Sequence, residues 1–273
     1  MAAEAPWRFF DLHVVRAERL SPHMARVTFG ADDLGGFVSG GRDQRIKLFF
    51  PHPGQEETVV PRSPEDWFGE WRALDPDVRG IMRTYTVRAQ RAGEVDIDFA
   101  LHGDVGPASR WAGAARPGHT VVALGPTLAD NGGVEFEPPA GTGSFVIAGD
   151  ETALPAIGAI LDWLPAGGRA RVWIEVPEPA DRQDLRSAAD TEITWVEPGT
   201  LIDTIRAADL PADAYCWIAG EAGAVRGLRR HLVNERGYDR SAVEFMGYWR
   251  RGAGEEQLLA ESLAGQNPHT GED

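Results

Sequence analysis

The first half of the chain alternates between apolar and polar residues with a period of two, the pattern of β-strands that bury one face. Turn-forming residues separate nearly all of the alternating runs. A series of short strands of this kind predicts an antiparallel sheet closed into a small barrel. The predicted strands are residues 9–17, 25–30, 44–50, 82–89, 94–101 and 120–124.

The pattern changes after a turn-rich stretch at residues 131–143, where strands and helices begin to alternate. This order predicts a doubly wound α/β domain, with a parallel sheet, helices on its faces and ligands at the carboxyl ends of the strands. We therefore divide the chain into a barrel (1–130), a linker (131–143), an α/β domain (144–251) and an acidic tail (252–273). The predicted strands are 144–148, 170–176, 192–196, 214–219 and 243–249, and the predicted helices are 153–164, 201–208 and 222–236.

A long excursion, residues 51–80, separates the third predicted strand from the fourth. It contains three large aromatic residues, Trp67, Phe68 and Trp71. Their spacing is compatible with an amphipathic helix that packs on the barrel, or with a segment that covers a site.

Composition limits the class of protein. With 273 residues, 42% hydrophobic and 25% charged, the chain is globular and long enough for two domains. The net charge of -15 argues against a nucleic-acid partner. The chain has neither 18 consecutive apolar residues nor a basic amino-terminal region before an apolar run, so we expect a cytoplasmic protein without membrane insertion. We also expect a monomer.

Several chemistries are excluded by what the sequence lacks. The single cysteine, Cys216, rules out an internal disulfide and a cysteine-based metal site, and its apolar neighbours predict a buried strand. The seven histidines have no spacing typical of metal ligands, so we predict no metal site. Neither a nucleophile elbow of the G-x-S-x-G type nor a P-loop is present.

The strongest local signal is Arg83-Thr84-Tyr85-Thr86, at the start of a predicted strand. Side chains two apart on a strand share a face, so Arg83 and Tyr85 are placed to bind one extended ligand. An arginine suits a phosphate, a tyrosine offers a flat surface to a ring, and Thr86 offers a hydroxyl and an N–H near the edge of that ring. The alternative is an ordinary strand with one exposed arginine.

A second signal spans residues 102–112, where a strand gives way to a glycine-containing loop and a proline. Proline favours the first turn of a helix, whose unpaired N–H groups attract anions. A pyrophosphate would then lie on Ala108 and Ser109, although a plain strand-to-helix turn explains the same residues.

A third signal, residues 149–156, closes the first strand of the α/β half and opens its first helix. Residues 220–223 occupy the equivalent place after a later strand, so Thr152 and Gly220 are candidates to border a nicotinamide. The acidic Asp150 and Glu151 are unusual neighbours for a pyrophosphate. They are also candidates to cap the helix.

Read in order, R-T-Y-T (83–86), H-G-D-V-G-P-A-S-R-W-A (102–112), G-D-E-T-A-L-P-A (149–156), G-E-A-G-A-V-R-G-L-R-R-H-L (220–232) and G-Y-W-R-R-G (247–252) resemble the siderophore-interacting proteins. These are flavin-dependent ferric-siderophore reductases built like ferredoxin–NADP reductases. The resemblance covers roughly residues 9–252. It implies an enzyme with an FAD-binding barrel and an α/β domain that binds NADPH or NADH.

The resemblance also implies roles for individual residues. Tyr85 and Thr86 would be the catalytic pair, with Tyr85 stacked on the isoalloxazine and Thr86 near its N5 edge. The remaining implied cofactor contacts are Arg83 and Thr84 beside the FAD phosphates and ring; His102 and Gly103 near the flavin; Gly106, Ala108 and Ser109 at the pyrophosphate; Asp150, Glu151, Thr152, Ala153, Gly220 and Glu221 at the nicotinamide; and Trp249 over the flavin side.

Two points differ from the family pattern or stay open. Thr127 stands where the family often has an arginine, which puts that arginine's contacts in doubt. Glu175, at the end of a predicted strand, favours NADH, whereas Arg171 and Arg182 favour NADPH.

An acidic protein needs a local positive patch to receive an anionic ferric siderophore. Lys47 is the only lysine in the chain, and we expect it to form that patch with Arg250 and Arg251. The alternative is a lysine that merely extends from the surface. Two other functions stay open, namely a general NAD(P)H:flavin or ferredoxin-type reductase, and a siderophore-binding module without redox activity.

Overall fold

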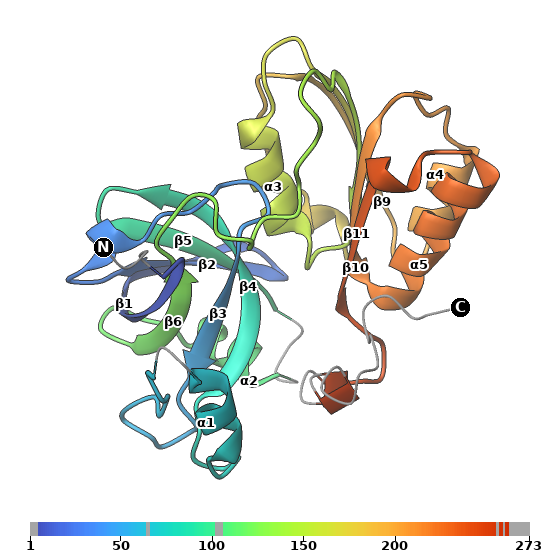
Figure 1. Ribbon diagram of the computed structural model, residues 1–273. Coiled ribbons are helices and arrows are strands. Elements are labelled where there is room, and N and C mark those ends of the chain that lie inside the picture. The colour runs from blue at the N-terminus through green and yellow to red at the C-terminus, as the bar shows by residue number, and fades with distance from the viewer. Residues whose placement is uncertain (1–4, 64–65, 102–105, 255–256, 259, 262–273) are drawn as a thin grey trace. The chain divides into compact units, whose positions relative to one another are not determined.

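The computed structural model describes residues 5–63, 66–101, 106–254, 257–258 and 260–261. The chain forms two compact units, Met1–Val134 and Glu135–Asp273, which are described separately here (Figure 1).

The first unit is a closed barrel of antiparallel strands in the order β1-β2-β5-β4-β3-β6 (Figure 1). This confirms the antiparallel barrel expected from the period-two pattern. The strands are β1 (Trp7–Ser21), β2 (Met24–Gly30), β3 (Arg45–Phe50), β4 (Ile81–Arg91), β5 (Glu94–Ala100) and β6 (Thr120–Pro126), and a 3-10 turn, η1 (Leu34–Gly36), follows β2.

The barrel closes because β1 is long enough to pair with two neighbours. Its first half, from Trp7 to His13, lies beside β6, and its second half, from His13 to Ser21, lies beside β2. Register shifts after Val14 and Arg19 mark β-bulges, which bend a strand and increase its twist. The strand therefore passes from one side of the barrel to the other.

Helix α2 (Pro107–Gly113) packs its apolar residues against the barrel core, and its start at Pro107 agrees with the sequence prediction. Trp111 is its main anchor. The indole is stacked on Phe29, with ring centroids 6.1 Å apart, and lies 5.1 Å from the Phe50 ring. Burial of a large aromatic side chain is one of the strongest single contributions to a core.

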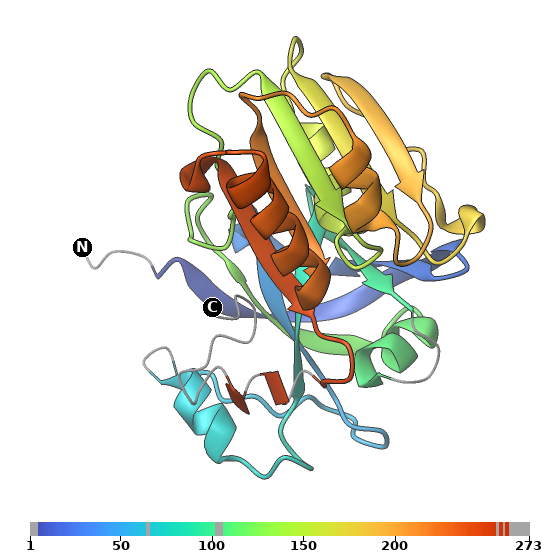
Figure 2. The same ribbon diagram turned by 90° about the vertical axis from the view of Figure 1, so that its right-hand side faces the viewer.

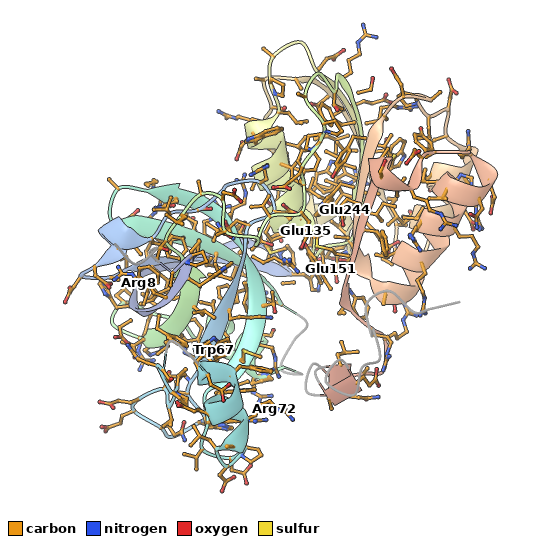
Figure 3. The ribbon with its side chains drawn as sticks, in the orientation of Figure 1. Arg8, Trp67, Arg72, Glu135, Glu151 and Glu244 are labelled. Atoms are coloured by element: carbon orange, nitrogen blue, oxygen red, sulfur yellow. The ribbon has the colours of Figure 1, made fainter. Side chains whose placement is uncertain are left out.

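The excursion between β3 and β4 contains α1 (Trp67–Ala73), so it packs as an amphipathic helix, as one of the two alternatives predicted. Trp71 is buried, and its indole N–H donates to the carbonyl of Gly80 at 2.9 Å. Trp67, labelled in Figure 3, meets the Phe9 and Phe49 rings edge-on at 5.7 and 5.9 Å. These contacts hold the helix on the outer surface of the barrel.

The second unit contains a five-stranded parallel sheet in the order β11-β10-β7-β8-β9. Helix α3 packs on one face and helices α4 and α5 on the other, which confirms the doubly wound arrangement (Figures 1 and 2). The elements are β7 (Ser144–Gly149), α3 (Leu154–Trp163), β8 (Arg169–Glu175), η2 (Pro179–Asp181), β9 (Asp190–Val196), α4 (Leu201–Ala207), β10 (Tyr215–Glu221), α5 (Ala222–Arg230), η3 (His231–Glu235), η4 (Arg240–Ala242) and β11 (Val243–Trp249).

Central strands of this sheet are apolar on both faces, as expected when helices cover both sides. Cys216 and Ile218 of β10 pack with Ile205 of α4 and Leu228 of α5. Cys216 is fully buried, as predicted, and burial raises the pKa of its thiol to about 12. The thiol is therefore an inert core group at neutral pH.

The helices of the described ranges include none that is both long enough and apolar enough to span a bilayer.

Candidate functional site

In the first unit, Arg83 and Tyr85 lie on the same face of β4, as the sequence predicts. Across the strand pair they stand opposite Leu48 and Ile46, two residues of the barrel core. Both side chains are half-buried, and the Arg83 Nη1 donates to the carbonyl oxygen of Met82 at 2.7 Å. A guanidinium and a phenol ring are thus held side by side on one surface.

Thr84 and Thr86 project from the opposite face of β4, where they stand across from Lys47 and Arg45. The Lys47 Nζ donates to the Thr84 Oγ1 at 2.7 Å. Thr86 is buried and Thr84 is exposed. The R-T-Y-T motif therefore presents different chemistry on the two sides of one strand, and the side chains of Tyr85 and Thr86 do not share a face.

An aromatic cluster joins the β4 motif to helix α2. The Tyr85 ring centroid lies 4.4 Å from that of Phe99 and 6.2 Å from that of Phe50. Trp111 of α2 contacts both of those rings, at 6.2 and 5.1 Å. Sequence analysis did not single out Phe50 and Phe99, although their inward positions on the two strands that flank β4 were a usable signal.

The amino-terminal turn of α2 supplies backbone donors. Gly106 is the N-cap residue, Pro107 opens the helix, and Ala108 and Ser109 are buried in its first turn. N–H groups in a first turn have no acceptor within the helix, and the positive end of the helix dipole favours an anion. His102 and Gly103, predicted to lie near the flavin, are outside the described residues.

This group of residues fits FAD. A pyrophosphate requires positive charge and N–H donors, which Arg83 and the first turn of α2 provide. A flavin ring requires a flat apolar surface, which the half-buried Tyr85 provides. The backbone at Gly106 also has open space beside it for a ligand. A Cβ built there would have no heavy atom nearer than the Ser109 Cβ, at 3.9 Å.

In the second unit, the Asp150 carboxylate connects the ends of three strands. Its Oδ1 accepts from the Thr152 backbone N–H at 3.0 Å and from the Thr152 hydroxyl at 2.5 Å. Its Oδ2 accepts from the backbone N–H of Glu221 and from the indole N–H of Trp249, both at 2.8 Å. Asp150 follows β7, Glu221 ends β10 and Trp249 ends β11, so one buried side chain ties together the carboxyl edge of the sheet.

Gly220 is required by this arrangement. Its φ of +137° lies outside the region that other residues readily adopt. A Cβ at this position would also lie 2.5 Å from the Asp150 Oδ2. The backbone of β10 can approach the carboxylate only because no side chain intervenes.

Glu221 caps the helix that follows it. Its Oε2 accepts from the backbone N–H groups of Gly223 at 2.6 Å and Ala224 at 2.9 Å, and its Oε1 accepts from Arg251 N–H at 3.2 Å. The suggested capping of α3 by Asp150 or Glu151 is wrong. The N-cap of α3 is Ala153, and no side chain caps it.

Arg250 and Arg251, predicted to bind substrate, lie just after β11. Arg250 forms a bidentate ion pair with Glu261, with N–O distances of 2.8 and 2.7 Å, and Gln257 donates to the same carboxylate at 2.9 Å. The side chain of Arg251 is exposed. Sequence analysis missed Glu261 because a partner in an acidic tail cannot be recognised from spacing alone.

Thr127 serves the fold locally. Its backbone N–H donates to the carbonyl of Pro6 at 3.0 Å, and its hydroxyl donates to the carbonyl of Ala5 at 2.6 Å. These bonds fasten the entry to β1 beside the end of β6.

Glu151 lies directly after Asp150 at the end of β7 (labelled in Figure 3). Burial, and after it the charge of Asp150, raise the pKa of Glu151 to about 7. Glu175 and Asp181 add smaller contributions in the same direction. The carboxyl edge of the sheet is therefore an electronegative environment.

Comparison with known proteins agrees with this geometry. The model of the siderophore-interacting FAD-binding domain matches residues 13–130, and that of the siderophore-interacting protein matches residues 142–252. The first match covers the barrel and the second covers the parallel sheet. The chain belongs to the siderophore-interacting protein family.

Three relatives illustrate the range of similarity. An uncharacterised protein of Mycobacterium tuberculosis is 36% identical, over 92% of this chain and 96% of the relative. The ferric vibriobactin reductase ViuB of Vibrio cholerae is 32% identical, over 90% of both chains. The NADPH-dependent ferric-chelate reductase of Escherichia coli is 30% identical, over 89% of this chain and 93% of the relative.

Solved structures show the same family and fold. The siderophore-interacting protein SipS of Aeromonas hydrophila has a TM-score of 0.77 at 35% identity, covering 94% of this chain and 97% of that one. A siderophore utilization protein from T. fusca has a TM-score of 0.80 at 34% identity, covering 91% and 95%. The ferredoxin reductase of carbazole 1,9a-dioxygenase, at 15% identity and a TM-score of 0.61 over 91% and 71%, shares the fold.

The bonds of Asp150 predict a large loss of stability on truncation. We expect Asp150→Ala to lower the free energy of unfolding by about 3 kcal/mol, because it leaves several buried donors without an acceptor. Urea unfolding measures the loss, and Trp249 emission reports the freed indole. The matched control, Asp184→Ala, removes a carboxylate that is 86% exposed and should change stability by less than about 0.5 kcal/mol. Equal losses in the two variants would contradict the role given to Asp150.

The raised pKa of Glu151 predicts a pH-dependent stability. The usual pKa is 4.5 and the folded value is about 7, so the folded state binds this proton more tightly than the unfolded state does. The resulting stabilisation is complete below the usual value and is lost as the pH rises toward 7. The free energy of unfolding of the wild type, compared with that of Glu151→Gln, should therefore fall as the pH rises from 4.5 to about 7. Above that range the difference between the two proteins should stay constant. A constant difference across that range, measured by urea unfolding, would show that Glu151 titrates normally.

Proposed function

We propose that this protein is an FAD-dependent NAD(P)H oxidoreductase that reduces the iron of ferric siderophores. The observation that carries this function is that β4, which holds Arg83 and Tyr85 on one face, is joined through the aromatic cluster of Tyr85 to α2, whose first turn supplies N–H donors. The same chain supplies a doubly wound sheet, the usual support for a dinucleotide.

The first unit binds the FAD in this account. When bound, FAD supplies a group that can take up two electrons as a hydride and pass them on one at a time to Fe(III). Fe(II) binds hard oxygen ligands more weakly than Fe(III) does, so reduction favours release of the iron. Arg83 holds the pyrophosphate with the amides of Ala108 and Ser109, beside Gly106. Tyr85 supports the ring by its flat face.

The two threonines of the motif have different tasks because they project from the other face of β4. Thr84 orients the ammonium group of Lys47 through its hydroxyl. Thr86 is assigned to the N5 edge of the flavin. Because its side chain lies on the face of β4 opposite to Tyr85, its backbone N–H is the group suited to contact the flavin. His102 and Gly103, which are outside the described residues, stay predicted contacts of the flavin.

The second unit binds the nicotinamide nucleotide. Thr152 and Gly220, at the ends of neighbouring strands β7 and β10, border the nicotinamide. Asp150 and Glu221 act as supports, because their carboxylates already accept hydrogen bonds from the backbone and from Trp249. Ala153 is the N-cap residue of α3. The indole N–H of Trp249 donates to Asp150, which holds the ring at the carboxyl edge.

Lys47 is the proposed contact for an anionic ferric siderophore. Its neighbour on the same face of β3 is Arg45, two residues away, so the outer side of this strand carries two positive charges in a chain of net charge -15. The Lys47 ammonium group donates to the neutral hydroxyl of Thr84. Glu261 forms an ion pair with Arg250, which offsets the charge of that arginine.

Reduction of bound flavin tests the function directly. We expect the purified protein to bind FAD, to oxidise NAD(P)H, and to reduce ferric siderophores faster than ferricyanide or free flavin. Arg83→Ala should weaken FAD binding by about 10- to 100-fold, the usual cost of a lost charge-assisted contact. Arg116→Ala, which removes an exposed arginine of the same unit, is the control and should not change it.

Two outcomes would favour the other candidates. Equal rates with ferric siderophores, ferricyanide and free flavin would indicate a general flavin or ferredoxin-type reductase. Failure to bind FAD, with siderophore binding retained, would indicate a module without redox activity.

The role of Lys47 predicts a change confined to the acceptor. Lys47→Ala should raise the KM for an anionic ferric siderophore by about fivefold, the scale of one exposed charge contact, while the rate of flavin reduction by NAD(P)H stays unchanged. Lys47→Arg keeps the charge and should restore most of the affinity. Steady-state assays at low and high salt measure both effects, and an unaltered KM in Lys47→Ala would remove this residue from the siderophore site.

A further inference from the structure

The order of strands in the second unit fixes where a dinucleotide lies. From β7 the chain proceeds outward to β8 and β9, and then returns to the other side of β7 to form β10 and β11. The order therefore reverses between β7 and β10, and in doubly wound sheets the dinucleotide crosses the carboxyl ends of the strands at that point. In such sheets the residue that ends the next strand, here β8, meets the adenosine ribose.

Glu175 occupies that position. It is the last residue of β8, 26 residues after Gly149, and it is half-buried. Its Oε2 accepts from the Leu201 backbone N–H at 3.3 Å, which fixes the carboxylate at the carboxyl edge. Within the described part of the chain, its Oε1 has no hydrogen-bond donor. A carboxylate oxygen so placed accepts from a ribose hydroxyl and repels a phosphate on the same carbon.

The segment that follows Glu175 adds negative charge. Residues 176–186 contain three carboxylates and two arginines, a net charge of -1 in addition to that of Glu175. One of these arginines, Arg186, lies 3.6 Å from the Asp184 carboxylate. The effect of Glu175 and Asp181 on the pKa of Glu151 shows that the field of these carboxylates reaches the end of β7 as well. A 2'-phosphate would enter this field carrying up to two further negative charges.

The arginines that favour NADPH on sequence grounds are poorly placed. Arg171 is the third residue of β8, four residues before the carboxyl end, or about 13 Å along the strand. Its Nε lies 3.2 Å from the Glu192 carboxylate, and it also donates to the carbonyl of Asp209, which precedes β10. Arg171 therefore lies away from the proposed ribose site. Arg182 is exposed, beyond the turn η2 and between the acidic residues Asp181 and Asp184.

We propose that this enzyme selects NADH over NADPH, and that Glu175 is the residue that determines the choice. The inference rests on the proposed function, because it assigns a substrate to the nucleotide site of the second unit. The relative from Escherichia coli is named as NADPH-dependent. The proposed preference for NADH therefore differs from that of this relative, and it is argued from the residues at the end of β8 alone.

Two measurements test the inference. The first is kcat/KM for reduction of bound FAD by NADH and by NADPH without siderophore, and the second is the Kd of 5'-AMP and of 2',5'-ADP by calorimetry, which needs no flavin. We expect the wild type to favour NADH and 5'-AMP by about tenfold or more. Glu175→Gln should cut both preferences by about tenfold, chiefly by improving the KM of NADPH.

Glu192→Gln is the matched control, because it makes the same chemical change on the neighbouring strand β9. Glu192 lies beside Arg171, toward the amino-terminal ends of the strands. It should leave both ratios unchanged. A wild-type preference for NADPH or for 2',5'-ADP would overturn the inference, as would equal shifts in Glu175→Gln and Glu192→Gln. Absence of flavin reduction by either nucleotide would instead overturn the proposed function, and the AMP and ADP affinities would still decide the selectivity.

Discussion

The carboxyl edge of the parallel sheet in the second unit depends on the hydrogen bonds that the Asp150 carboxylate accepts. Four donors converge on it, from the β7–α3 turn, the end of β10 and the end of β11. Replacing a buried acceptor leaves its donors unsatisfied, so the geometry of all three strand ends is coupled to one side chain. Gly220 is part of the same constraint, because only glycine lets β10 approach the carboxylate. The proposed nucleotide site therefore depends on residues that hold the strand ends as well as on the residues assigned to the ligand.

In the first unit, aromatic packing fixes the position of the candidate site residues. Its R-T-Y-T strand separates two chemistries, with Arg83 and Tyr85 on one face and Lys47, paired with Thr84, on the other. Phe99 and Trp111 then fix the position of Tyr85 relative to α2. The paired strands β3 and β4 therefore present a guanidinium and a phenol on one face and an ammonium group on the other.

The two-unit fold could be predicted from the sequence because its periodicity is strong, and the apolar run around Cys216 correctly predicted a buried strand. The site was harder to predict. Motif spacing identified Arg83 and Tyr85, since residues two apart on a strand share a face. It could not show that Asp150 bonds to Trp249, which lies 99 residues away, or that Glu261 pairs with Arg250. Such partners are set by tertiary packing, which leaves no local pattern.

The most direct test of the account is anaerobic absorbance spectroscopy of the FAD-loaded protein. Addition of NADH should bleach the flavin band near 450 nm, roughly the position typical of oxidised flavin. Subsequent addition of a ferric siderophore should restore the band while a ferrous chelator takes up two equivalents of Fe(II) for each flavin, because a hydride carries two electrons. A flavin band that NADH leaves unchanged, or one that bleaches and is not restored by the ferric siderophore, would contradict the account.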